Sequence, residues 1–528
     1  MTTATGRPAD AFHVYDTTLR DGSQREGLSL SVEDKLAVAG YLDDLGVGYV
    51  EGGWPGANPK DAAFFRRAAA GELELRHAQL AAFGATRKPA VDVADDPQVR
   101  ALLDAQTPVV TLVAKSHTGH VTRALRTTLD ENLAMVHDTV SFLVREGRRV
   151  FLDAEHFFDG YLLDHDYALA VVRTAAEAGA EVVALCDTNG GMLPGRLAEV
   201  VHEVAGLGVR VGIHAHDDTS CAVANSLAAV SAGATHVQGT ANGYGERAGN
   251  ADLFAVVAAL ELKLDRQVLP AGSLSELVRV SHAIAEVANI APDDHQPWVG
   301  ASAFAHKAGL HASALKVDPD LYQHADPAAV GNDMRVLVSE LAGRASIELK
   351  ARELAIAVDR ETVARVTARV KEMEAAGYSF EAAEASFELL LREEVDGERA
   401  RFFELESYRV ISEHRPDGGH VSEATVKLHA KGERFVATGE GNGPVNALDR
   451  ALRQALERLH PQLATLELVD YKVRILEGAH GTGAVTRVLV RTSDGAREWD
   501  TVGVDENVIS ASWQALDDAY TYGLLHSV

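Results

Sequence analysis

Arg20 and Asp21 are adjacent charged residues at the end of a short apolar stretch, and their types and spacing suit chemistry. Together with Gln24 they place a cation, a carboxylate and an amide within five residues. In a protein built from repeated strand–helix units, residues that follow a strand lie where catalysis takes place. A surface salt bridge beside the Gly22 turn is the alternative, so other parts of the chain must decide between the two.

The strongest second cluster is His214-Ala215-His216-Asp217-Asp218, which follows an apolar stretch. Alternate side chains of a strand share one face, so His214 and His216 can point the same way. Two imidazoles in this arrangement form half of a divalent metal site, although a hydrogen-bonded histidine pair would look the same. Asp21 and Asn250 are the candidate oxygen donors that complete the set. Such ligands suit Mg²⁺, Mn²⁺, Co²⁺ or Zn²⁺ and leave positions open for a chelating substrate.

Short strand-like stretches alternate with helical stretches over the first half of the chain and must position these residues. Ser31 and Asp34 form a capping-box pattern at the start of one helix, and Gly46 ends it. Eight such units over about 250 residues favour a closed (β/α)8 TIM barrel, an α/β fold, over an open doubly wound sheet. The expected strands are residues 12–17, 47–53, 78–84, 108–114, 149–154, 181–186, 210–215 and 235–240. Their ends carry further polar residues, namely Glu51, Lys115, Asp153, Glu155 and Asp187-Thr188-Asn189.

We expect three domains: the barrel at 10–268, a helical accessory or linker region at 269–400, and a C-terminal α+β domain at 401–528. In the second region, apolar residues recur at helical spacing between Val363 and Met373. The third contains an internal repeat, because Tyr408, Gly432 and Thr438 recur 63 positions later as Tyr471, Gly495 and Thr501. The pattern of each copy predicts three strands followed by a helix, and two such units form a small α+β domain. We expect this domain to serve in binding or assembly.

The composition narrows the class of protein. A net charge of −27 over 528 residues disfavours a nucleic-acid or anionic-membrane partner, because both favour a basic patch. An anionic small-molecule substrate remains possible, because one arginine or metal ion next to it can outweigh the repulsion from distant negative charges of the protein. Two cysteines, Cys186 and Cys221, fit a reducing compartment. The chain has neither a signal-like segment nor an apolar run of membrane-spanning length, so we expect a cytoplasmic protein.

Three motifs together resemble a known family. They are D-T-T-L-R-D-G-x-Q from Asp16, H-A-H-D-D from His214, and G-x-G-E-R-A-G-N from Gly243. They are similar to the motifs of the TIM-barrel acyltransferases that comprise the 2-isopropylmalate, homocitrate and citramalate synthases. The resemblance covers nearly the whole chain, because that family also has a helical linker and a C-terminal regulatory domain of two β-α repeats. It implies a condensation of acetyl-CoA with a 2-oxo acid, followed by hydrolysis of the thioester.

The resemblance also implies roles for single residues at the mouth of the barrel. A divalent metal, Mg²⁺ or Mn²⁺ with Zn²⁺ or Co²⁺ as alternatives, would chelate and polarise the 2-oxo acid. Its ligands would be Asp21, His214, His216 and Asn250. Arg20 would neutralise the developing alkoxide, Thr188 would hydrogen-bond the substrate carboxylate, and Gln24 would support the metal site.

The general base is expected from the accessory region. His311 matches the family position, acting within its own chain or in the partner chain, and Glu155 and Tyr322 would assist it. A surface histidine in a polar, flexible insert is the alternative for His311.

Within the family, residues 51–61, 82–88 and 153–160 resemble the citramalate synthase branch, which uses pyruvate on a threonine-independent route to isoleucine. A pyruvate pocket needs apolar bulk, for which Phe83 and Leu112 are candidates. A synthase for a bulkier 2-oxo acid, such as 2-isopropylmalate or homocitrate synthase, is the main alternative, because one methylene changes affinity by only about 1–3 kcal/mol. A hydroxymethylglutaryl-CoA lyase is disfavoured, since residues 239–250 lack a cysteine. A non-catalytic amino-acid sensor with an inactive barrel is also disfavoured, because the candidate catalytic and metal-binding residues are all present.

The C-terminal repeat resembles the family's feedback domain, which binds a branched-chain amino acid at a dimer interface. We therefore expect a homodimer inhibited by isoleucine. Glycine-containing turns at the two helix starts suit a carboxylate, and the candidate residues there are Gly441, Asn442, Gly443, Val504 and Asp505.

Overall fold

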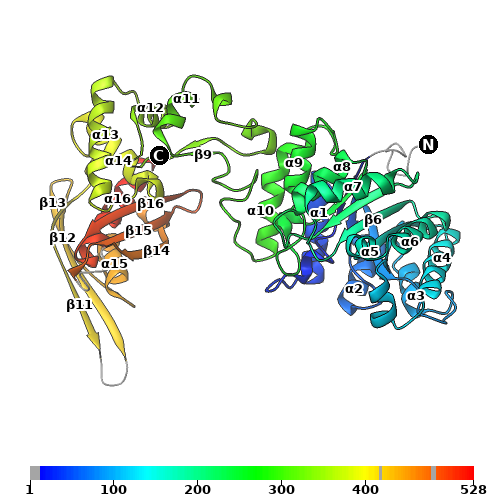
Figure 1. Cartoon of the computed structure of the whole chain (residues 1–528). Helices are drawn as coiled ribbons and strands as arrows, with labels where there is room; N and C mark the ends of the chain where they lie inside the picture. Colours follow the sequence, from blue (N-terminus) through cyan, green and yellow to red (C-terminus); the bar gives the residue numbers. More distant parts are fainter. Residues whose placement is uncertain (1–11, 340, 415–418, 477–482, 528) are drawn as a thin grey trace. The chain divides into compact units, whose positions relative to one another are not determined.

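The structure is a computed structural model that describes residues 12–339, 341–414, 419–476 and 483–527. The chain forms two compact units, Met1–Phe304 with Ala325–Asp333, and Ala305–His324 with Met334–Val528. The first unit holds a barrel wrapped by helices, and the second holds helices, a two-stranded sheet and two three-stranded sheets (Figure 1). Residues 10 and 11 of the expected barrel domain lie outside the described residues.

Eight parallel strands close into a barrel in sequence order, with β1 paired to β8. The predicted (β/α)8 fold is therefore confirmed, and each strand lies within two residues of its expected bounds. The strands are β1 His13–Asp16, β2 Tyr49–Glu51, β3 Gln79–Ala85, β4 Val109–Lys115, β5 Arg149–Glu155, β6 Val182–Asp187, β7 Val211–Ala215 and β8 His236–Gly239.

Side chains of the strands alternate between the inside and the outside of the barrel. Tyr15, Tyr49 and Phe151 belong to a small inner cluster, whereas Val14, Val50 and Leu152 belong to the large cluster shared with the helices. This alternation fixes which strand residues can reach the mouth of the barrel.

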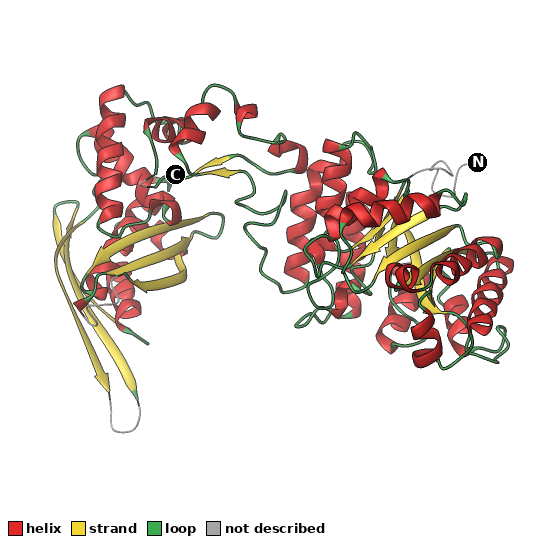
Figure 2. Cartoon of the chain, viewed as in Figure 1, coloured by secondary structure: helices red, strands yellow, loops and turns green. Residues whose placement is uncertain are grey.

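Helices follow the strands and cover the outside of the barrel (Figure 2). Helix α1 begins with the predicted capping box of Ser31 and Asp34 and ends at Gly46, whose φ of 90° is left-handed. The other α-helices of this unit are α2 Pro59–Arg67, α3 Pro97–Asp104, α4 Leu129–Arg145, α5 Phe157–Leu163, α6 His165–Glu177, α7 Pro194–Ala205, α8 Ala222–Ser231, α9 Leu253–Lys263 and α10 Leu277–Val287, with α1 at Val32–Leu45. Short turns of helix are η1 Gly22–Gln24, η2 Ala68–Glu72, η3 His120–Leu125, η4 Ala241–Gly243, η5 Ser273–Glu276 and η7 Pro327–Val330.

A buried ion pair joins α1 to α2. Lys35 is 3% exposed, and its ammonium group pairs with the Asp61 carboxylate and donates to the Gly52 carbonyl at 3.1 Å. Removing one partner leaves the other charge buried without compensation, which costs about 3–5 kcal/mol. We expect the Lys35→Met variant to lose that much unfolding free energy, measured by denaturant titration of the barrel transition. The exposed Lys88 supplies the control variant Lys88→Met. A loss below about 1 kcal/mol in Lys35→Met would contradict the buried pair.

The second unit begins with short elements and then becomes helical. Its strands β9 Ala305–His306 and β10 Arg335–Val336 pair in parallel. The helices are α11 Gly309–Leu315, α12 Arg344–Glu353, α13 Arg360–Ala375 and α14 Glu384–Asp396, with the turns η6 Pro319–Leu321 and η8 Phe380–Ala382. The expected helix around Val363 and Val370 is present, and both residues are buried. His311 lies on α11 rather than in a flexible insert.

The C-terminal repeat is confirmed as two copies of three antiparallel strands and a helix. Tyr408 and Tyr471 both reach α16, where their hydroxyl groups bond Ser510 at 3.0 Å and Ser512 at 2.8 Å. The copies comprise β11 Glu404–His414, β12 His420–Ala430, β13 Glu433–Gly441 and α15 Pro444–Leu456, then η9 Pro461–Thr465, β14 Glu467–Ile475, β15 Thr486–Ser493, β16 Glu498–Asp505 and α16 Val508–Leu525. Among the described helices of the chain, none is long and apolar enough to cross a membrane.

Candidate metal centre

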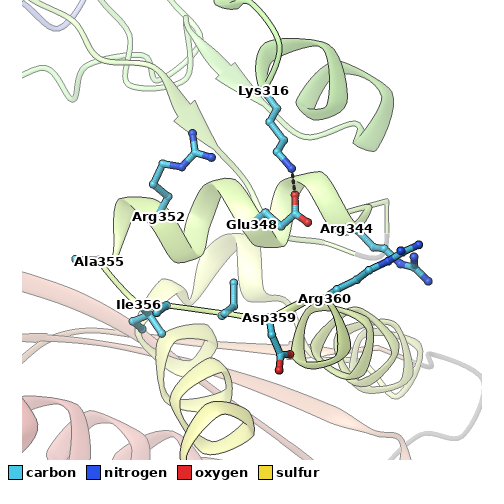
Figure 3. Close-up of a pocket in the computed structure, with 10 residues that line it drawn as sticks. Lys316, Arg344, Glu348, Arg352, Ala355, Ile356, Asp359 and Arg360 are labelled. Carbon is cyan, nitrogen blue, oxygen red and sulfur yellow. Dashed lines mark hydrogen bonds and ion pairs between the residues drawn. The ribbon is translucent and has the colours of Figure 1, made fainter.

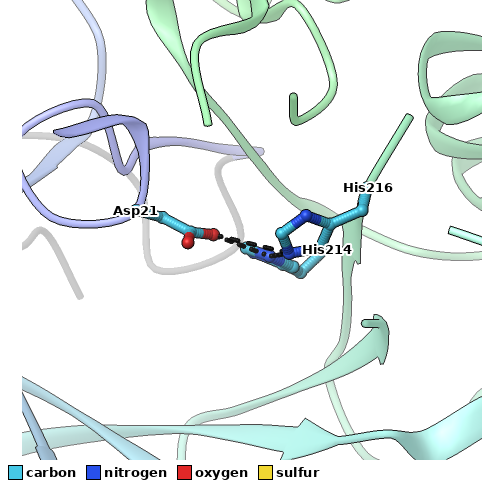
Figure 4. A group of neighbouring side chains, drawn as sticks. All are labelled: Asp21, His214 and His216. Carbon is cyan, nitrogen blue, oxygen red and sulfur yellow. Dashed lines mark hydrogen bonds and ion pairs between the residues drawn. The ribbon is translucent and has the colours of Figure 1, made fainter. Parts of the chain in front are cut away.

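Asp21, His214 and His216 converge at one end of the barrel (Figure 4). Asp21 follows β1, His214 lies on β7, and His216 comes just after β7. An Asp21 carboxylate oxygen lies 3.1 Å from Nε2 of His214 and 3.7 Å from Nε2 of His216. The Asn250 amide nitrogen donates to the same Asp21 oxygen at 2.8 Å. Three segments distant in sequence thus bring one carboxylate, two imidazoles and one amide together.

The donor atoms of this cluster fit a divalent cation. The ligand atoms of Asp21, His214 and His216 lie within 4.8 Å of one another, and all three side chains are buried. Asn250 Oδ1 is buried without a hydrogen-bond partner among the described residues. Gly245 makes room for that oxygen, since a Cβ on Gly245 would lie 1.9 Å from it. A carboxylate oxygen, two imidazole nitrogens and a free amide oxygen are the ligand types that such metals take.

Burial and charge prepare two of the titratable residues of this cluster for a metal. The third, His214, is shifted the other way: burial lowers its pKa, but the hydrogen bond and charge of Asp21 outweigh burial and raise it. Burial raises the pKa of Asp21, but the Arg20 charge and the His214 hydrogen bond outweigh it, so the pKa lies below its usual range. Burial and the neighbouring His214 lower the pKa of His216 to about 4. Asp21 is therefore ionised and His216 neutral near neutral pH, as ligation requires.

Gln238 and Asp153 orient His214 from behind. The Gln238 amide oxygen lies 2.8 Å from His214 Nδ1, and the Gln238 amide nitrogen donates to Asp153 at 2.7 Å. Burial raises the pKa of Asp153 to about 6. A partner on Nδ1 leaves Nε2 facing Asp21, which is how ligating histidines are usually fixed. The sequence carried a signal for Gln238, since a polar residue alternates with Val237 at a strand end.

Arg20 is held on three sides beside the cluster. Its Nε pairs with the Glu51 carboxylate, its NH1 lies 3.7 Å from Asp21, and its guanidinium carbon stacks 3.8 Å from the centre of the Phe83 ring. Glu51 is fully buried and also accepts a bond from the Tyr15 hydroxyl at 2.8 Å. Glu51 therefore holds Arg20 in place, a role that the sequence alone did not reveal.

A three-loop clamp surrounds Thr188, the residue after β6. Arg247, from the loop after β8, bonds Asp218 through Nε at 2.8 Å and NH2 at 2.9 Å, and NH2 also donates to the Thr188 carbonyl at 2.8 Å. The Thr188 hydroxyl oxygen accepts from the His156 amide at 2.9 Å. Gly190 lets the loops approach, because a Cβ there would lie 2.4 Å from Asp218. Arg247 thus ties together the loops after β6, β7 and β8.

The other candidate residues of the barrel do not all lie beside the metal-type cluster. Glu155 ends β5 and pairs with Lys115, and Phe83 lies under Arg20 and packs edge-on against Trp54. Gln24 is exposed, and no side-chain bond joins it to the cluster. Leu112 does not reach the barrel mouth, because it packs in the outer cluster with the helices. Its neighbour Thr111 faces inward and bonds the Tyr15 hydroxyl at 2.6 Å.

His311 and Tyr322 lie together in the second unit. Their rings stack with centroids 4.2 Å apart and planes 30° apart. Both side chains are partly exposed, so another molecule can reach the two rings.

The candidate regulatory residues lie at the starts of α15 and α16. Gly443 caps α15 without a side-chain bond, and Gly441 packs so closely that a Cβ would lie 2.6 Å from the Ala447 amide. The second helix, α16, begins at Val508, and Asn507 is its cap. Asp505 accepts from the Asn507 amide at 2.8 Å, and the Val504 amide donates to Gln514 at 3.0 Å.

Comparisons with known proteins agree with the fold and the motifs. The HMGL-like family model matches residues 11–284, the homocitrate synthase post-HMGL domain-like model matches 298–377, and the LeuA allosteric (dimerisation) domain model matches 381–524. An (R)-citramalate synthase of Streptomyces coelicolor is 69% identical over 99% of both chains. One of Synechocystis is 50% identical over 97% of this chain and 96% of its own. A 2-isopropylmalate synthase of Pyrococcus furiosus is 31% identical over 96% and 98%. The chain therefore belongs to the HMGL-like family and, within it, to the family of 2-isopropylmalate, homocitrate and citramalate synthases that its motifs resemble.

Proposed function

We propose that this protein is an (R)-citramalate synthase, which condenses acetyl-CoA with pyruvate and hydrolyses the thioester to release CoA. The observation that carries the proposal is full-length identity of 47–69% to four bacterial (R)-citramalate synthases, against 31% to a 2-isopropylmalate synthase. The presence of Asp21, His214 and His216 as a group that could hold a metal ion supports the proposal that the enzyme is active.

The residues at the mouth of the barrel have different roles in the condensation. Asp21, His214, His216 and Asn250 would hold a divalent cation, Mg²⁺ or Mn²⁺, which when bound supplies Lewis acidity to the keto group. Arg20 places its guanidinium beside that cluster and stabilises the alkoxide as negative charge develops. Glu51 and Phe83 keep Arg20 in position without a rearrangement at the moment of reaction.

Thr188 binds the pyruvate carboxylate. Its hydroxyl oxygen already accepts from the His156 amide, so the hydroxyl proton remains available to donate to the substrate. Phe83 closes the space beside Arg20 with apolar bulk, which suits the methyl group of pyruvate.

His311 acts as the general base that takes a proton from the acetyl methyl group, with Tyr322 stacked against it and Glu155 assisting. An imidazole has a suitable pKa for this step. The proposal for these three residues rests on the family motif and on the His311–Tyr322 stack.

The test of the function is release of CoA from acetyl-CoA in the presence of pyruvate. We expect release to require pyruvate, to stop in EDTA, and to return when Mn²⁺ or Mg²⁺ is added in excess. Activity that is indifferent to chelation would remove the metal from this proposal.

Arg247 gives a prediction for substrate binding. We expect the Arg247→Gln variant to raise KM for pyruvate about tenfold or more with kcat within about threefold, because Thr188 loses the bond that fixes its loop. In a Thr188→Val background the same change should have little further effect on KM. The control is Arg196→Gln, which removes an arginine whose side chain is 53% exposed and which pairs with Glu199 at 2.7 Å. Additive effects of the Arg247 and Thr188 changes would contradict the clamp.

We further propose that the C-terminal domain makes the protein a homodimer and binds isoleucine as a feedback inhibitor, near residues 441–443 and 504–505. The match to the LeuA allosteric (dimerisation) domain model supports this. Inhibition by isoleucine should be lost when residues 401–528 are removed, provided that the shortened chain keeps turnover. Isoleucine sensitivity in an active shortened chain would contradict it.

A further inference from the structure

A pocket of about 610 Å³ lies in the second unit, and none of the residues assigned a role above lines it (Figure 3). One wall is a face of α12 on which Arg344, Glu348 and Arg352 recur at four-residue spacing. Lys316 borders it after α11, and Arg360 borders it as the first residue of α13. Four cationic side chains therefore surround one pocket in a chain whose net charge is −27.

The carboxylates of this pocket are already engaged. Glu348 pairs with Lys316, and Asp359 caps α13 by accepting from the Thr362 amide at 2.7 Å. Within the described part of the chain, Arg344, Arg352 and Arg360 have no ion pair or side-chain hydrogen bond. Other arginines of the same unit do find carboxylates, namely Arg335, Arg365, Arg369, Arg392 and Arg399. Three guanidinium groups without such a partner therefore border one pocket of an acidic chain.

The pocket also has features that favour a particular kind of anion. Ile356 and Val358 form an apolar floor that packs on the core below. Helix α12 begins at Arg344 without a side-chain cap on its first amides, and a helix start favours negative charge. Guanidinium groups bind phosphate through paired hydrogen bonds. The volume lies in the range of about 300–1,000 Å³ that is usual for small-molecule sites.

We propose that this pocket binds a nucleotide, with Arg344, Arg352 and Arg360 on its phosphate groups and Ile356 and Val358 beneath its apolar face. Two sources share that chemistry. One is the phosphorylated adenosine of coenzyme A, and this source rests on the proposed function. The other is a free nucleotide such as ADP, which would act as an effector.

The test is calorimetric titration of the full chain with CoA and, separately, with ADP. The Arg344→Gln/Arg352→Gln/Arg360→Gln variant is compared with the wild type and with Arg365→Gln/Arg369→Gln, whose arginines pair with Glu394. We expect the triple change to raise the Kd of at least one probe tenfold or more, and the control to change it less than twofold. Thermal unfolding checks that each variant folds. If the triple variant does not fold, Arg352→Gln alone is tested instead, and it should raise the Kd about threefold.

The two probes separate the sources. A higher Kd for CoA together with a higher KM for acetyl-CoA assigns the pocket to the coenzyme. A higher Kd for ADP with an unchanged KM for acetyl-CoA assigns it to a free nucleotide. Unchanged affinity of the triple variant for both probes, or no saturable binding of either by the wild type at millimolar concentration, would overturn the proposal. A wild type that binds a probe but makes no citramalate would reject the proposed function and leave the pocket standing.

Discussion

The Asp21→Asn variant is expected to lose at least about 10³-fold in kcat/KM, because a neutral amide replaces the one carboxylate of the metal cluster. Asp21 is the residue that contacts His214, His216 and Asn250 together. The fold should survive, since Arg20 keeps its pair with Glu51. Steady-state rates in excess Mn²⁺, with Mn²⁺ affinity measured by titration, check both parts of the expectation.

The matched control is Asp95→Asn, which removes an exposed aspartate whose only ion pair among the described residues is with Arg100 at 3.2 Å. It should leave the rate and the Mn²⁺ affinity within about twofold of the wild type, as an exposed pair contributes little. An Asp21→Asn enzyme with near-normal turnover and unaltered Mn²⁺ affinity would show that the cluster does not bind the catalytic metal.

The Arg20→Lys variant is expected to lower kcat about 10²–10³-fold while Mn²⁺ affinity stays within about threefold. Lysine keeps the charge, but it cannot pair with Glu51 through Nε and also direct a second nitrogen towards the metal cluster. The ammonium group also loses the flat contact with the Phe83 ring. Single-turnover rates at saturating pyruvate separate this loss from weaker binding.

For Arg20 the control is Arg100→Lys, since Arg100 is 61% exposed and lies outside the barrel mouth. If Arg20→Lys kept kcat and only raised KM, Arg20 would bind the ground state and would not stabilise the developing alkoxide.

The barrel was predictable because its signals are local. Apolar stretches such as 149–154, separated by helical patterns and ended by Gly46 or similar residues, repeat with regular spacing. The Asp21 and His214 positions followed from the same logic, since both come at strand ends. The repeat of Tyr408 at Tyr471 likewise predicted two copies of one unit. None of these inferences needed knowledge of side-chain packing.

The surroundings of other predicted residues depend on tertiary packing. Gln24 was expected to support the metal cluster, but the structure places Gln238 behind His214. Leu112 was expected in the pocket wall, although strand alternation puts Thr111 inside and Leu112 against the helices. The polar Thr111 within an apolar strand was a usable signal for that choice. The partners of Arg20 lie on β2 and β3, and those of Arg247 lie in the loops after β6 and β7. No local pattern reveals either set.

The proposed function requires pyruvate to be the 2-oxo acid that this enzyme prefers. The direct measurement is kcat/KM for pyruvate and for 2-oxoisovalerate, from initial rates of CoA release with saturating acetyl-CoA and Mn²⁺. The role proposed for Phe83 predicts a preference for pyruvate of about tenfold or more, because each extra methyl group of the larger acid must find space. Equal or better use of 2-oxoisovalerate would contradict the proposed citramalate synthase activity and identify a 2-isopropylmalate synthase instead.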